Sequence, residues 1–156
     1  MTAGLKWKVD RGSEAIVVAF AGSIDEDARL DTLTGELSGA PRLRFDMGGI
    51  TRINSCGVRE WVNFMRAIPP GTRATLENCP SVVVAQVNMI SNFSGPARVA
   101  SVRVPYVCKD CGFDAELPMD TPPGARPVLP AMQCPRCKKS EFIFDDLADS
   151  YFAFLT

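Results

Sequence analysis

Two pairs of cysteines in the last third of the chain constrain its fold more than any other feature of the sequence. Each pair has the spacing CxxC, 22 residues separate the pairs, and the four members are Cys108, Cys111, Cys134 and Cys137. A CxxC turn presents two thiolates to one ion, and two such turns complete the tetrahedral cage that is usual for structural zinc. A cage closed in this way leaves no position for a substrate. We therefore expect one zinc ion that stabilises the fold and does not catalyse a reaction.

Disulfide bonds are the alternative use of these four cysteines. Residues 1–8 lack the basic start and the apolar core of a secretory signal peptide. The sequence therefore favours a cytoplasmic protein, in which thiols stay reduced and a zinc site is the expected outcome.

The composition narrows the functions that the chain can have. Its 156 residues suit one medium domain and a small appendage, and its longest apolar stretch, residues 15–21, is too short to span a bilayer. Histidine is absent, which removes the commonest general base and the commonest zinc ligand other than cysteine. The sequence also contains no P-loop and no recognisable nucleophile–base set. We expect a protein that is not an enzyme and has no membrane partner.

The distribution of charge argues against a nucleic-acid partner. From Pro105 onward the chain has 5 basic and 8 acidic residues, whereas the part up to Val104 has 12 basic and 10 acidic residues. Four thiolates around one divalent zinc ion would add a further formal charge of −2. Zinc modules that grip nucleic acid need the opposite sign, because neutralising phosphates supplies much of their affinity.

Hydrophobic periodicity in the first hundred residues predicts strands that alternate with helices. The expected strands cover residues 5–9, 15–21, 42–47, 73–77 and 99–107. The expected helices have apolar stripes at Leu30, Leu33 and Leu37, at Val58, Trp61, Val62 and Met65, and at Val83, Val87 and Ile90. Asp25 is the expected cap of the first helix and Gly39 its end. This order indicates an α/β fold in which helices cover a mixed sheet.

Two short motifs in this framework resemble a known family. Gly22-Ser23-Ile24-Asp25 follows the second strand, and Ile53-Asn54-Ser55-Cys56-Gly57-Val58 follows the third. Together with the order of elements over roughly residues 5 to 104, they resemble the STAS domain, typified by bacterial anti-sigma-factor antagonists. The resemblance implies a STAS-like mixed sheet with covering helices. It also implies a protein partner, an anti-sigma factor or kinase, that binds near the second motif.

The second motif departs from the family pattern at two positions. Family members commonly have Asp-Ser-Ser-Gly here, and a partner kinase that doubles as the anti-sigma factor phosphorylates the second serine to control binding. In this chain Asn54 replaces the aspartate and Cys56 replaces that serine, so the usual switch does not carry over. Ser55 remains, either as a helix cap or as a candidate phosphorylation site. Cys56 is either a packed side chain or a reactive thiol stabilised by the helix N-terminus.

We therefore expect three parts: a STAS-like domain over residues 1–104, a four-cysteine zinc ribbon over 105–145, and an aromatic tail over 146–156. The proline-rich stretch 122–130 is the expected connector between the ribbon strands. The tail has apolar residues at helical spacing, which predicts a helix that folds back on the protein or docks on another protein. These tail residues are Leu147, Tyr151, Phe154 and Leu155.

The function that these features favour is a non-enzymatic protein–protein interaction module that regulates bacterial signalling. Its partner-binding turn is expected at Asn54, Ser55, Cys56 and Gly57, and the protein is expected to be a monomer or a weak homodimer. The alternative is a transcription-related zinc-ribbon protein that docks on polymerase or on nucleic acid.

Overall fold

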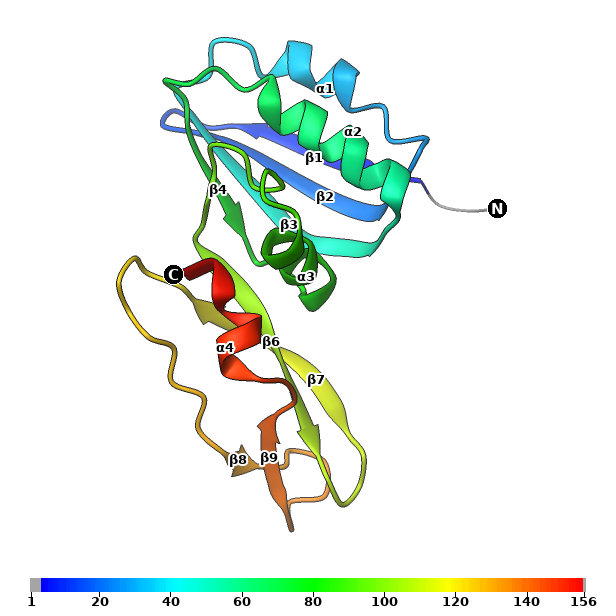
Figure 1. The fold of residues 1–156 in the computed structure, drawn as a ribbon, viewed down its shortest axis with the longest axis vertical. Helices are drawn as coiled ribbons and strands as arrows, with labels where there is room; N and C mark the ends of the chain where they lie inside the picture. Colours follow the sequence, from blue (N-terminus) through cyan, green and yellow to red (C-terminus); the bar gives the residue numbers. More distant parts are fainter. Residues whose placement is uncertain (1–3, 156) are drawn as a thin grey trace.

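The computed structural model describes residues 4–155 and contains two β-sheets that are joined end to end (Figure 1). The first sheet has the strand order β1-β2-β3-β4-β5, in which β1 runs antiparallel to β2 and the other neighbours are parallel. Its strands are β1 (Lys6–Arg11), β2 (Ile16–Ile24), β3 (Arg42–Ile53), β4 (Arg73–Glu77) and β5 (Arg98–Val99). The mixed sheet that the sequence predicts is therefore present.

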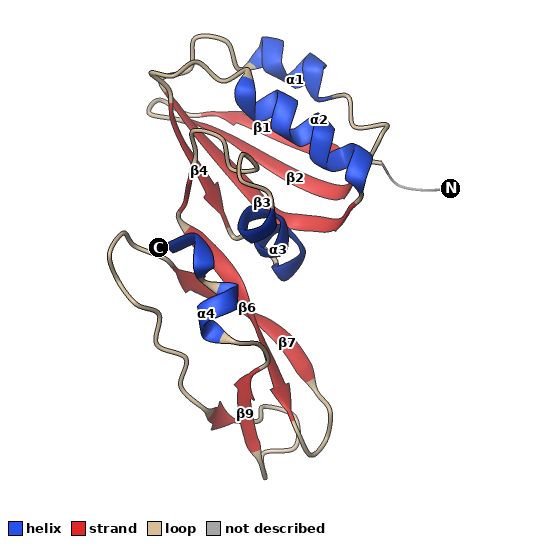
Figure 2. Ribbon diagram, in the orientation of Figure 1, coloured by secondary structure: helices blue, strands red, loops and turns tan. Residues whose placement is uncertain are grey.

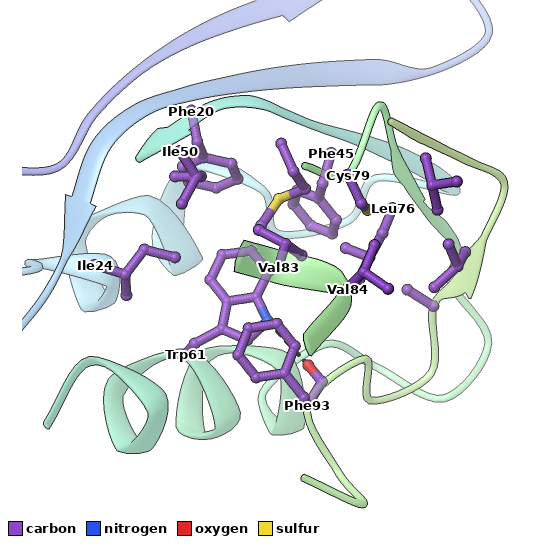
Figure 3. Packing of buried hydrophobic residues seen from close by; sticks show 14 of the residues in the cluster. Phe20, Ile24, Phe45, Ile50, Trp61, Leu76, Cys79, Val83, Val84 and Phe93 are labelled. Atoms are coloured by element: carbon purple, nitrogen blue, oxygen red, sulfur yellow. Dashed lines mark hydrogen bonds between the residues drawn. The ribbon is translucent and has the colours of Figure 1, made fainter. Parts of the chain in front are cut away.

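Three helices cover one face of this sheet (Figure 2). They are α1 (Leu30–Glu36), α2 (Ser55–Arg66) and α3 (Ser81–Met89). Side chains of α2 and α3 reach the same buried side chains of the sheet, as Figure 3 shows. At the centre Trp61 is fully buried between Phe20 and Phe93, and its Nε1–H donates to the carbonyl oxygen of Phe93 at 2.9 Å. The predicted apolar stripes thus contact the core, except that Phe64 and not Val62 lies on the buried side of α2.

The expected cap of α1 is wrong. The Oδ1 atom of Asp25 accepts a hydrogen bond from the backbone N–H of Asp27 at 2.9 Å, so Asp25 closes a local turn and does not cap a helix. The helix begins five residues later, after Arg29, whose side chain makes no capping bond. The predicted end is supported by Gly39, which has a left-handed φ of 82°.

The second sheet is antiparallel throughout and has the order β7-β6-β9-β8. Its strands are β6 (Ser101–Cys108), β7 (Asp114–Asp120), β8 (Met132–Gln133) and β9 (Glu141–Phe144). The chain then forms the short helix α4 (Ala148–Tyr151) and a 3-10 turn, η1 (Ala153–Leu155), which lie beside α3 and β6 (Figure 1). No helix within residues 4–155 is both long and apolar enough to cross a membrane.

The strand expected over residues 99–107 is divided between the two sheets. Val99 ends β5 in the first sheet, and Ser101 begins β6 in the second. In one continuous strand Val99 and Val102 would point to opposite faces, yet both are buried because the chain passes from one sheet to the other between them. The expected domain boundary at residue 104 falls inside β6.

Backbone hydrogen bonds fasten the two sheets together at this point. The N–H of Cys79 donates to the carbonyl of Ser101 at 3.1 Å, and the N–H of Arg103 donates to the carbonyl of Cys79 at 2.8 Å. These bonds form a parallel bridge between Cys79 and Val102. The junction is therefore a hydrogen-bonded contact and not a free linker.

The tail folds back on the protein. Asn88 of α3 donates through Nδ2 to the carbonyl oxygens of Ser150 and Tyr151, and its Oδ1 accepts from the N–H of Phe154. Tyr151 is buried and its hydroxyl donates to the carbonyl of Arg103. The internal-docking alternative of the sequence analysis is the one that the structure adopts. Leu147 is the exception, because it is 72% exposed and does not share the buried stripe.

Candidate metal centre and partner-binding turn

The four cysteines of the two CxxC pairs meet at the far end of the second sheet. All four Sγ atoms lie within 4.8 Å of one another. The Sγ atoms of Cys108 and Cys137 are 3.7 Å apart, as are those of Cys111 and Cys134. A tetrahedral site with zinc–sulfur bonds of about 2.3 Å has edges of about 3.8 Å. The donor set and its spacing therefore fit one tetrahedral metal ion.

Two turns of the same shape present these thiols. In the first, the N–H of Gly112 donates to the carbonyl of Cys108 at 2.9 Å; in the second, the N–H of Lys138 donates to the carbonyl of Cys134 at 3.0 Å. Gly112 and Lys138 both have left-handed φ values, 78° and 59°. Glycine adopts this conformation freely, whereas a lysine held there is strained. Lys138 therefore marks a turn whose shape the surrounding structure imposes.

Hydrogen bonds and neighbouring thiols set the acidity of two cysteines in this cluster. Burial acts to raise the pKa of Cys134, but the backbone N–H groups of Cys137 and Arg136 and the other thiols outweigh it and lower that pKa to about 6. The N–H of Phe113 acts to lower the pKa of Cys111, but burial and the other three sulfurs raise it to about 11. The lowered pKa of Cys134 favours its thiolate, which is the form that binds metal.

The charge of the segment from Pro105 onward is more unevenly distributed than its net value of −3 indicates. Four of its five basic residues lie in or beside the cysteine turns and are exposed; they are Lys109, Arg136, Lys138 and Lys139. Their positive charges oppose the negative charge that four thiolates around a divalent ion would leave. Sequence counting over the whole segment missed this local balance.

A chain of aromatic rings supports the metal-binding end. Phe113 stacks on Phe142 with a centroid distance of 5.7 Å, and Phe142 contacts Tyr106 at 5.5 Å. Phe144 continues the contacts toward the tail, where it meets Tyr151 at 5.6 Å. These rings therefore continue the apolar core from the tail to the metal-binding end of the second sheet.

The turn at residues 54–58 joins β3 to α2 and is capped by Asn54. Its Oδ1 accepts from the N–H of Gly57 at 2.7 Å, and its Nδ2 donates to Oε2 of Glu26 at 3.1 Å. Of the two alternatives for Ser55, the helix cap is wrong, because Asn54 supplies the acceptor and Ser55 is already the first helical residue. Glu26 lies 28 residues away in sequence, so no local pattern could have identified it.

Gly57 fixes the position of this turn against the first sheet. A Cβ atom at Gly57 would lie 1.9 Å from the carbonyl oxygen of Ile24, at the end of β2. The N–H of Asn54 donates to that same oxygen at 3.2 Å. Only glycine allows so close an approach of the helix backbone to the strand.

The structure leaves the two side chains between Asn54 and Gly57 accessible. Ser55 and Cys56 are both exposed. Cys79, the other cysteine outside the metal cluster, is fully buried, and burial raises its pKa to about 12, so it remains an unreactive thiol. The residues that the sequence analysis assigns to the turn are therefore together, and a partner can reach three of them, Asn54, Ser55 and Cys56.

Comparisons with known proteins bear on the fold. The crystal structure of an anti-sigma factor antagonist from Mycobacterium paratuberculosis aligns with a TM-score of 0.52 and 15% sequence identity, covering 63% of this chain and 90% of that one. The fold is STAS-like. A second solved structure, the unphosphorylated anti-sigma factor antagonist SpoIIAA, aligns with a TM-score of 0.41 and 19% identity, covering 60% of this chain and 87% of its own. No protein-family model and no curated protein matches the sequence.

Proposed function

We propose that this chain is a non-enzymatic regulator that binds a protein partner through the exposed turn at residues 54–58. The partner is of the anti-sigma-factor or kinase class, and the role is that of an anti-sigma-factor antagonist in a bacterial cytoplasm. The observation that carries the proposal is the STAS-like fold, whose α2 begins with two accessible side chains, Ser55 and Cys56, on a rigidly held backbone.

The rigidity of the turn favours a binding role. Asn54 caps the helix, and Gly57 packs directly on the carbonyl of Ile24, so the accessible side chains have little freedom to lose when a partner binds. The turn needs no ordering step, and a preformed surface of this kind suits protein recognition.

The control of this turn would differ from a serine switch at position 56. Cys56 has no hydroxyl to phosphorylate, and Ser55 is the only hydroxyl between Asn54 and Gly57. Glu26, bonded to Asn54, already places a negative charge beside the turn. A phosphate on Ser55 would add about −1.5 to −2 charge, favoured by the helix N-terminus and opposed by Glu26. We infer that binding is either constitutive or controlled through Ser55.

The second sheet would hold one structural zinc ion. Cys108, Cys111, Cys134 and Cys137 would be its four ligands, and the ion would stabilise the two turns that carry them. With all four positions filled by thiolates, the ion supplies no site for a substrate. In this proposal residues 105–145 are a zinc ribbon that is appended to the STAS-like domain over residues 1–104.

Affinity capture with turn variants tests the proposed function. The full chain and its Cys56→Arg and Ala85→Arg variants are used as baits in lysate of the source cell, and bound proteins are identified by mass spectrometry. Both substitutions add one arginine at an exposed helical position, but Ala85 lies on α3, away from the turn. We expect a histidine-kinase-like or sigma-related protein with the wild type and Ala85→Arg, and its loss with Cys56→Arg.

Two results would contradict the proposed function. The first is capture of the same partner at equal yield by Cys56→Arg, which would place the contact elsewhere. The second is capture of RNA polymerase subunits alone, which would favour the transcription-related alternative.

A further inference from the structure

The first sheet has one face that the helices do not cover. Side chains alternate between the two faces of a strand, and Val18, Phe45 and Leu76 form a buried row, of which Figure 3 shows Phe45 and Leu76 beside residues of α2 and α3. The neighbouring positions along the same strands point to the other side. Within residues 4–155 α1, α2 and α3 all lie against the buried side, so the opposite face has no helix on it (Figure 2).

The side chains on this open face form two charged rows across the strands. The first row, from β1 to β4, is Lys8, Ala19, Asp46 and Glu77. The second row, from β1 to β5, is Asp10, Val17, Arg44, Thr75 and Arg98. In the first row the β1 side is positive and the β3 side is negative. In the second row these signs are reversed.

The side chains in the middle of the open face are small and apolar. Val17, Ala19 and Ala21 of β2 lie between the charged side chains of β1 and those of β3. Lys6 lies opposite Ala21, which in turn lies opposite Gly49 of β3, so a third row has a positive end and a position without a side chain. Small residues along β2 allow another flat surface to approach closely.

This arrangement is complementary to itself under one rotation. A two-fold axis that runs parallel to β2 exchanges the β1 side of one copy with the β3 side of the other and keeps each row at the same height. Lys8 then faces Asp46 of the second copy, Asp10 faces Arg44, and β2 faces β2. Each pair occurs twice, so four contacts join opposite charges, and the rotation brings no two like charges of these rows together.

The charged side chains have atoms available for these contacts. The side chains of Lys8 and Asp10 are exposed and have no hydrogen-bond or ion-pair partner among residues 4–155. Asp46 accepts from Gly48 and Asn78 through Oδ1 alone. Arg44 uses Nε and Nη2 for its bonds to Glu77, which leaves Nη1 available.

We propose that the open face of the first sheet binds the same face of a second copy of this chain, with the β2 strands stacked along a two-fold axis. The face spans about four strands and six residues, or roughly 400 Å² per copy at ordinary strand spacings. Stable interfaces bury about 800 Å² per partner, so the dimer is weak and concentration-dependent. Because α2 lies on the other side of the sheet, both turns at residues 54–58 remain accessible in the dimer (Figure 1).

Sedimentation velocity over a concentration series tests this dimer with the full chain. The exchange variant Lys8→Glu with Asp10→Lys keeps the net charge but makes both rows repulsive against the second copy. The matched control, Arg29→Glu with Asp31→Lys, makes the same exchange at two exposed positions on the helix side. We expect a dimer in the wild type and the control. In the exchange variant the dissociation constant rises at least about ten-fold.

A second variant tests the same contact without changing the edge strand β1, in case the exchange variant misfolds. Ala19→Glu places two carboxylates face to face at the axis and should also abolish the dimer, while circular dichroism confirms that each variant is folded. A wild-type protein that stays monomeric up to millimolar concentration overturns the proposal. An exchange variant that dimerises as tightly as the wild type also overturns it, because the contact then uses another surface.

Discussion

Asn88→Ala should release the C-terminal tail without unfolding the rest of the protein. The side chain of Asn88 makes three hydrogen bonds to the tail, with Ser150, Tyr151 and Phe154. A hydrogen bond of this kind contributes about 0.5–1.5 kcal/mol to stability. One of the three is exposed to water. We therefore expect the tail to lose about 2 kcal/mol, which raises the population of its open form roughly 30-fold.

Hydrogen exchange measured by mass spectrometry is the direct assay. The amides of Tyr151 and Phe152 are bonded to carbonyls at the start of the tail, at 2.9 and 3.0 Å, so their exchange reports opening of this segment. A peptide covering the tail should exchange faster by roughly the same 30-fold factor in Asn88→Ala, while peptides from β2 and β3 stay unchanged.

Asn92→Ala is the control, because Asn92 is exposed and its side chain has no partner among residues 4–155. Unchanged exchange of the tail in Asn88→Ala would show that these three bonds do not hold it. The tail would then be free to serve as a docking peptide for another protein, which is the alternative that this structure disfavours.

Four further outcomes follow from the same contacts. Protein purified under reducing conditions should contain one zinc ion per chain and Cys111→Ser should not; elemental analysis without stoichiometric metal in the wild type would reject the zinc site. Gly57→Ala should lower the free energy of unfolding by roughly 3 kcal/mol in denaturant titrations, because its Cβ would lie 1.9 Å from a carbonyl oxygen. Gly35→Ala is the control: Gly35 has open space around it in α1, so this variant should raise the free energy of unfolding by about 0.5–1 kcal/mol. A Gly57→Ala variant as stable as the wild type would contradict this packing. Burial raises the pKa of Tyr151. The stability that its neutral hydroxyl provides is therefore complete below the ordinary tyrosine pKa of about 10 and is lost as the pH rises beyond that value. Hydrogen exchange of the tail should accelerate at such pH values, and Tyr151→Phe should remove that extra acceleration. In gel-shift assays at physiological salt the protein should not select any duplex DNA sequence over competitor DNA, and a selective shift would contradict the charge argument.

Local periodicity was sufficient to predict most of the first sheet and its helices. Trp7 and Val9 alternate with lysines because β1 has one half-buried and one exposed face. Trp61 and Met65 fall on one side of α2 because that side meets the sheet. The cysteine spacing likewise predicted that four thiols would meet. In each case the signal lies within a few residues of the feature that it predicts.

The features that sequence analysis missed depend on contacts between distant residues. Ser55 and Asp25 are both residue types that cap helices. In the structure, however, Asn54 accepts the hydrogen bond from the N–H of Gly57, and Asp25 accepts one from the N–H of Asp27 in a turn before α1. The division of the strand at residue 100 follows from pairing with two different sheets, which residue alternation alone does not reveal. The complementary rows on the open face require the register of β1, β2 and β3 at once.

Hydrogen exchange of the chain with and without its captured partner tests the proposed function most directly. If the partner binds at the turn, protection should appear in peptides covering residues 54–58 and the neighbouring segment around Glu26, and it should be lost with Cys56→Arg. The open face and the four-cysteine end should keep the exchange of the free protein. Protection confined to the cysteine turns or to the tail, with residues 54–58 unchanged, would contradict the proposal that this turn is the partner-binding surface.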